Sequence, residues 1–162
     1  MQRPPRKRRR TELMSFFRRV LDRLSTAPSE PQRLDYLNEA LALERLGDYV
    51  AALTSYRLGL RDNPNDPRIL QNMAIAFTKT GQPDEAIRHY RRALELDDSL
   101  SGAHYGLAFL HLKRGEPDRA TEHLRAFLAK PPRGSDADRW IQHANTALRD
   151  LEESPAAAVS SA

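Results

Sequence analysis

A period of 34 residues constrains this chain more than any other feature of its sequence. Gly47, Gly81 and Gly115 stand 34 residues apart, and an alanine follows each of them by five residues. Periods of this length indicate one supersecondary unit that is copied and stacked, so that neighbouring copies share a hydrophobic core. The three copies span residues 33–66, 67–100 and 101–134.

Each copy has the signals of two consecutive helices and none of a strand. The first helix is about thirteen residues long and ends at the glycine, which adopts the left-handed conformation found just past a helix C-terminus. The second helix begins most clearly at Pro83 and Pro117, because proline suits the first helical position and acidic residues follow it. The pattern therefore predicts three helical hairpins.

Small residues recur where the two helices of a hairpin must approach each other, and bulky residues recur between hairpins. The small set is Ala40, Ala52, Ala74, Ala86, Ala108 and Ala120. The bulky set, expected to wedge between one hairpin and the next, is Tyr56, Leu60, Phe77, Ile87, Tyr90, Leu94 and Leu128. A stack of repeats also needs an end cap. Residues 135–153 are predicted to form a capping helix with Trp140, Ile141, Ala144, Ala147, Leu148 and Leu151 inward and Asp138, Arg139, Gln142, Arg149 and Asp150 outward.

These features resemble the tetratricopeptide repeat family, and the segment from Gly81 to Asp97, GQPDEAIRHYRRALELD, is close to its consensus. Two positions depart from that consensus, Gly59 where alanine is usual and Asp98 where a terminal proline is expected. The resemblance implies an all-α fold, a right-handed superhelical stack of three hairpins plus the capping helix. It also implies a concave groove, lined by the first helix of each hairpin, that binds a peptide or helix of a partner protein.

The resemblance places positions 2, 5, 9, 12 and 13 of each repeat in this groove. These are Leu34, Leu37, Leu41, Glu44 and Arg45, then Arg68, Gln71, Ile75, Thr78 and Lys79, then Gly102, Tyr105, Phe109, Leu112 and Lys113. The candidate partner-binding residues are Leu34, Leu37, Leu41, Gln71, Asn72, Ile75, Lys79, Tyr105, Phe109 and Leu112. An exposed apolar strip of this kind predicts a guest with its own apolar stripe, such as an amphipathic helix. The alternative is that part of the strip packs against neighbouring helices within the stack.

Some members of the family hold the C-terminal carboxylate of a chaperone with a clamp of lysine, asparagine and arginine side chains. The corresponding residues here are Leu37, Leu41, Asn72, Gly102 and Gly106. Only Asn72 matches, and the clamp positions offer no cation to neutralise a carboxylate. The sequence therefore argues against that ligand.

The N-terminal part of the chain differs in character from the repeats. Residues 1–10 form a basic arm, predicted to be disordered, and residues 1–25 together hold nine basic and two acidic side chains. An amphipathic helix is predicted over 11–25, followed by a linker over 26–32, and a disordered tail is predicted over 154–162. The basic arm residues are Arg3, Arg6, Lys7, Arg8, Arg9 and Arg10, and the apolar face of the helix is Phe16, Phe17, Val20, Leu21 and Leu24.

Three interpretations of this N-terminal segment stay open. It docks on the repeat stack or on a partner, or it lies on an anionic membrane surface, where each cation adds about 1 kcal/mol. The third interpretation is a nuclear-import, nucleic-acid-binding or inert solubilising tail. A secretory signal is excluded because Arg18, Arg19, Asp22 and Arg23 interrupt the apolar core that export requires.

The remaining composition predicts a non-catalytic protein without cofactor or metal. The chain has no cysteine and no apolar run long enough for a transmembrane helix. No histidines lie three or four residues apart, and His104 and His111 would be about 10 Å apart on one helix, too far to share a metal ion. No phosphate-binding loop or nucleophile motif is present. These absences and the arginine-rich basic content indicate a bacterial cytoplasmic adaptor, with an attachment to the inner membrane as the alternative for its N-terminal helix.

Overall fold

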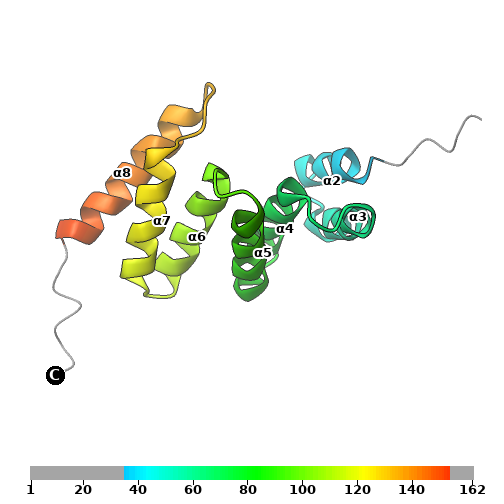
Figure 1. The fold of residues 1–162 in the computed structure, drawn as a ribbon, viewed down its shortest axis with the longest axis horizontal. Coiled ribbons are helices and arrows are strands. Elements are labelled where there is room, and N and C mark those ends of the chain that lie inside the picture. The colour runs from blue at the N-terminus through cyan, green and yellow to red at the C-terminus, as the bar shows by residue number, and fades with distance from the viewer. Residues whose placement is uncertain (1–34, 154–162) are drawn as a thin grey trace, which may run out of the picture. The chain divides into compact units, whose positions relative to one another are not determined.

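The computed structural model describes residues 35–153, which are helical with no strand in that range (Figure 1). Consecutive helices pack as antiparallel pairs, α2 with α3, α4 with α5 and α6 with α7, and α8 packs on α7. The helices span Tyr36–Arg45 (α2), Tyr49–Asp62 (α3), Pro67–Lys79 (α4), Pro83–Leu96 (α5), Ser101–Lys113 (α6), Pro117–Ala129 (α7) and Ala137–Glu153 (α8). This is the predicted all-α stack of three hairpins closed by a capping helix.

The turns inside the hairpins follow the predicted chemistry. Gly47, Gly81 and Gly115 have φ angles of 80°, 74° and 70°, a left-handed conformation that any side chain would strain. In each turn the residue after the glycine closes the helix end; the N–H of Gln82, for example, donates to the carbonyl of Phe77 at 2.8 Å. Each of α4, α5 and α7 begins with proline as its first residue.

The six alanines of the repeat are fully buried, so the two helices of each hairpin meet through them. The predicted wedges are also in place, with Tyr56, Phe77, Ile87 and Tyr90 buried in the main core. Leu60 and Leu94 pack against that core, and Leu128 packs against a second cluster at the C-terminal end of the stack.

The hydrophobic interior is therefore divided into two clusters. The main core extends from Ala40 in α2 to Leu110 in α6. The C-terminal cluster is centred on Ala108, Leu124, Phe127 and Ala144, and it joins α6 and α7 to α8.

At the start of the described residues, Asp35 caps α2 by accepting from the backbone N–H of Asn38 at 3.1 Å. The capping helix was expected over 135–153 and begins at Ala137, after a turn at Gly134. Of its predicted inward residues, Ile141, Ala144, Ala147, Leu148 and Leu151 contribute to the C-terminal cluster.

Trp140 was expected to face inward as well, and it does contact Tyr105 of α6, but it is not buried. Its side chain stays 41% exposed, because it lies in the first turn of α8 at the margin of the packed surface. The predicted outward residues of α8 are exposed.

Several predictions fall outside the described residues. They concern the basic arm over 1–10, the helix over 11–25 with its apolar face, the linker over 26–32, the tail over 154–162, and Leu34 in the groove. Within 35–153, no helix combines the length and the apolar character needed to cross a bilayer.

Candidate functional site

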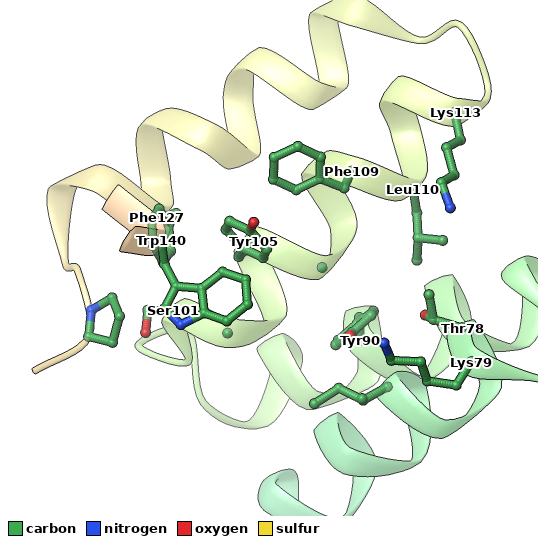
Figure 2. Close-up of a pocket in the computed structure, with 14 residues that line it drawn as sticks. Thr78, Lys79, Tyr90, Ser101, Tyr105, Phe109, Leu110, Lys113, Phe127 and Trp140 are labelled. Carbon is green, nitrogen blue, oxygen red and sulfur yellow. The ribbon is translucent and has the colours of Figure 1, made fainter. Parts of the chain in front are cut away.

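A cleft opens between the second and third hairpins and continues to the capping helix (Figure 2). Its volume is about 470 Å³, within the range of ligand pockets. We call it the cleft throughout. Its lining residues are Ile75, Thr78, Lys79, Tyr90, Ser101, Gly102, Tyr105, Gly106, Phe109, Leu110, Lys113, Phe127, Pro132 and Trp140.

Aromatic rings form the wall of the cleft near α8. The ring of Tyr105 lies 4.6 Å from Phe109, 5.2 Å from Phe127 and 5.3 Å from Trp140, measured between centroids. The contact with Trp140 is edge-on, an arrangement that aromatic pairs favour. Phe127 is buried, whereas Tyr105 and Phe109 are half-buried and Trp140 is exposed. The buried ring of Phe127 therefore anchors the wall, and the other rings present apolar surface to solvent.

His143 in α8 contacts two rings of this wall, Tyr105 and Phe109. Its Nδ1 lies 2.5 Å from the hydroxyl oxygen of Tyr105, and its ring stacks on Phe109 with centroids 4.5 Å apart and planes 2° from parallel. Burial raises the pKa of Tyr105, and the nearby Arg139 partly offsets that effect. The hydroxyl is thus a neutral hydrogen-bonding group that links α6 to α8.

Two glycines in α6 shape the opposite part of the cleft. Gly106 lies directly against the ring of Tyr90 from α5, so that a Cβ at this position would overlap the ring. A Cβ at Gly102 would lie 3.1 Å from Oε1 of Gln71 in α4. The absence of side chains here lets Tyr90 and Gln71 reach α6, and it leaves the groove side of α6 open next to Tyr105.

In the first two repeats, the side chain at position 12 lies beside the tyrosine at position 24. In the first hairpin the pair is Glu44 and Tyr56, and in the second it is Thr78 and Tyr90. Burial raises the pKa of Glu44, although the neighbouring Tyr56 hydroxyl partly offsets this, and burial also raises the pKa of both tyrosines. Glu44 Oε1 and the Tyr56 hydroxyl are buried without a well-formed hydrogen bond. The equivalent pair in the third hairpin, at residues 112 and 124, is leucine with leucine.

The structure brings together some of the predicted groove residues and separates others. Ile75, Lys79, Tyr105 and Phe109 line the cleft, and Gln71 lies beside it at Gly102. The remaining described candidates are half-buried and do not line it: Leu37, Leu41, Asn72 and Leu112. Leu37 packs against the main core, as the alternative interpretation of the strip expected. The apolar strip is therefore concentrated in the second and third hairpins.

Sequence reasoning did not assign Tyr90, Phe127, Pro132 or Trp140 to this site. Tyr90 and Phe127 come from second helices, which were expected to serve only packing. Trp140 comes from the capping helix, which has no place in the 34-residue register. One sequence feature could have pointed to Trp140: it is the one tryptophan of the chain, and it lies in the polar first turn of α8.

Three histidine side chains lie close together between α6 and α7, and none of them lines the cleft. Nδ1 of His104 lies 3.1 Å from Nδ1 of His123, and the ring of His123 stacks on His111 with centroids 5.6 Å apart. Buried His111 contacts Glu116 Oε2 through Nδ1 at 2.5 Å. Spacing along one helix could not show this meeting, because His123 belongs to the second helix. Among residues 35–153, no group of three or more histidine or acidic side chains has the geometry of a metal site.

Comparison with known proteins gives the same architecture. The sequence model of the tetratricopeptide repeat family matches residues 67–100, and a second model of that repeat matches residues 101–126. No curated protein sequence gives a significant match.

Solved structures resemble the stack over about three quarters of the chain. The Yersinia enterocolitica type III secretion chaperone SycD, in complex with a peptide of the translocator YopD, has a TM-score of 0.67 and 17% identity, covering 73% of this chain and 90% of SycD. The TPR2B domain of yeast Sti1, in complex with an Hsp70 peptide, has a TM-score of 0.63 and 22% identity, with coverages of 73% and 94%. The Sgt2 TPR domain of Aspergillus fumigatus has a TM-score of 0.62 and 24% identity, with coverages of 73% and 78%.

The identities to these structures establish a shared fold and nothing further. The repeat models match the second and third hairpins, whose turns, alanines and wedges follow the same 34-residue frame as the first. Residues 67–126 therefore belong to the tetratricopeptide repeat family, and the first hairpin has the same frame.

Proposed function

We propose that this protein is an interaction domain that binds an apolar segment of a partner protein in the cleft between its second and third hairpins. The observation that carries the proposal is the exposed aromatic wall. A soluble protein rarely leaves Tyr105, Phe109 and Trp140 together at the edge of an open cavity unless another surface covers them. Peptides that fill such grooves anchor themselves through a few apolar side chains.

The rigidity of the wall supports a binding role. His143 and Phe127 hold Tyr105 and Phe109 in place before any ligand arrives, and a preformed site loses less conformational entropy on binding. The similar stacks of SycD and Sti1 were solved with peptides of YopD and Hsp70. Those ligands belong to those proteins, but they show that a stack of this fold accommodates a peptide.

Trp140 provides a direct assay, because it is the one tryptophan of the chain and it lines the cleft. A displayed library of tryptophan-free 15-residue peptides is selected against the full chain, and the selected peptides are titrated while Trp140 fluorescence is recorded. We expect binding that changes this fluorescence and that weakens roughly tenfold or more in Phe109→Glu, as for central anchor residues of interfaces.

Two further variants separate binding from folding. Phe109→Ala removes the ring without adding a charge, and it should also weaken binding while circular dichroism stays that of the wild type. Val50→Glu places the same new charge on a side chain that is 70% exposed and remote from the cleft, and it should bind as the wild type does. Selected peptides that bind Phe109→Glu, Phe109→Ala and the wild type equally would disprove the proposal.

A further inference from the structure

Position 13 of every repeat carries a cation, and two of these three cations line the cleft. They are Arg45, Lys79 and Lys113, which are 34 residues apart, and each lies in the last turn of the first helix of its hairpin. All three are exposed. We call them the basic edge.

A favourable interaction with the helix dipole accounts for cations in the last turn of a helix. Some exposed cations of the stack pair with carboxylates, among them Arg92 with Glu95 at 2.9 Å and Arg114 with Asp84, whereas others do not. Within residues 35–153, no ion pair includes a member of the basic edge.

Two members of the basic edge also line the cleft itself. Lys79 comes from α4 and Lys113 from α6, and both border the same cavity as the aromatic wall. Figure 2 shows their ammonium groups on the same side of the cleft, near Tyr90 and Leu110, with Trp140 and Phe127 toward its other end. An apolar surface and a pair of unpaired cations therefore meet in one cavity.

From this arrangement we infer that the partner segment is acidic as well as apolar: its apolar side chains fill the cleft against Tyr105, Phe109 and Trp140, and its carboxylates pair with Lys79 and Lys113. This inference rests on the proposed function and adds the charge of the ligand. Complementary charge at the margin of an interface contributes to partner selection and to the rate of association. Basic segments are disfavoured by the same two lysines.

Glu44 makes the first hairpin less favourable for an acidic ligand than the second and third hairpins. Its half-buried carboxylate is next to Arg45 in sequence and has no cationic partner within residues 35–153, so it weakens the attraction of an anion at the first hairpin. The acidic part of the ligand therefore lies between the second and third hairpins, beside Lys79 and Lys113. This location differs from the clamp positions considered from the sequence, where only Asn72 matched.

Three peptide sets test the inference. All share the same positions randomised among leucine, isoleucine and phenylalanine at helical spacing, and their remaining exposed positions carry glutamate, glutamine or lysine. Each set is displayed and titrated against the full chain with Trp140 fluorescence as the readout. We expect the glutamate set to bind at least roughly fivefold more tightly than the glutamine set at low salt, and the lysine set to bind weakest, as expected for two ion pairs at a partly exposed edge.

A charge-matched pair of variants assigns the effect to the basic edge. Lys79→Gln combined with Lys113→Gln should abolish the preference for glutamate over glutamine. Arg57→Gln combined with Arg149→Gln removes the same two charges from exposed positions that line none of the cleft, and it should keep the preference. Added salt should reduce the preference, because charges at an exposed edge are screened.

The outcomes distinguish this inference from the proposed function. If the glutamate and glutamine sets bind equally well and both depend on Phe109, the inference is wrong and the proposed function stands. If the lysine set binds best, the inference is likewise wrong. If no set binds in a manner that depends on Phe109, both are wrong.

Discussion

The two hydrophobic clusters of the stack share the same 34-residue frame, but their aromatic rings lie in different places. In the main core, Tyr56 and Tyr90 fill the space between the hairpins, so the interior closes around them. In the C-terminal cluster, Leu124 replaces the tyrosine and Phe127 of α7 is the buried ring, while the rings that stay partly exposed are carried by α6 and α8. These rings lie at the edge of the packed region rather than at its centre, and the cleft opens beside them.

The difference shows how a repeat stack can leave a cleft open beside a packing position. Each internal hairpin is covered by the next copy, which brings the same wedge residues. The third hairpin is covered by α8, which lies outside the register and places Trp140 and His143 around Tyr105. The break in periodicity, rather than the periodicity, creates the candidate site.

Truncating Phe127 should give the largest loss in the free energy of unfolding. Its side chain is 1% exposed and supports both the C-terminal cluster and Tyr105. Phe127→Ala should lower the free energy of unfolding by about 3–5 kcal/mol, as for other buried aromatic truncations. Because repeat stacks open locally, hydrogen exchange should accelerate in α7 and α8 more than in α4 and α5. Equal acceleration in both regions would show that the two clusters form one cooperative unit.

Filling the space at Gly106 should have the next largest effect. A methyl group there would overlap the ring of Tyr90, so Gly106→Ala forces the ring or α6 to move. We expect a loss of about 1–3 kcal/mol in chemical unfolding, the usual cost of overpacking. Gly102→Ala is the matched control, because its methyl would meet the flexible amide of Gln71, and it should cost less. A larger loss for Gly102→Ala than for Gly106→Ala would contradict this account of the cleft.

The sequence predicted the frame of this molecule because each of its signals acts within one hairpin. A glycine that ends a helix, a proline that begins one and an alanine at a close crossing each depend on local geometry, and all three kinds are found in place.

The candidate site was predictable only in part, for a related reason. Ile75, Lys79, Tyr105 and Phe109 follow from the register, and they line the cleft. Trp140 depends on how the non-repeating α8 crosses the third hairpin, which no periodicity describes. The meeting of His104 with His123 likewise depends on the distance between two helices rather than on spacing along one.

Acidification should weaken the third hairpin through His123. Burial of its ring, together with the nearby His104, His111 and Arg91, lowers its pKa from 6.5 to about 4, although Glu122 acts in the opposite direction. The unfolded chain takes up a proton below about pH 6.5 that the folded protein resists, so this stability is complete above pH 6.5 and is lost toward pH 4. Allowing for the half-exposed ring, we expect unfolding at pH 5 to require about 1 kcal/mol less than at pH 7.

The control for this pH effect is a histidine of another hairpin. His123→Gln should flatten the dependence between pH 7 and pH 5, whereas His89→Gln, in the second hairpin, should preserve it. Measurements stop at pH 5 because contact with His111 lowers the pKa of Glu116, whose protonation adds a further loss at lower pH. An unchanged slope in His123→Gln would show that other groups dominate the acid response.

Neutralising Glu44 should give the smallest change in the free energy of unfolding, and this change should be a gain rather than a loss. Its carboxylate is half-buried without a cation, so burial raises its pKa, and Gln at this position removes a charge while keeping an acceptor for Tyr56. We expect Glu44→Gln to stabilise the fold by less than about 1 kcal/mol at pH 7, measured by chemical unfolding. The gain should shrink as the pH falls, because protonation of Glu44 neutralises the wild-type carboxylate too. A loss of stability at pH 7 would mean that the charge of Glu44 is compensated within the main core.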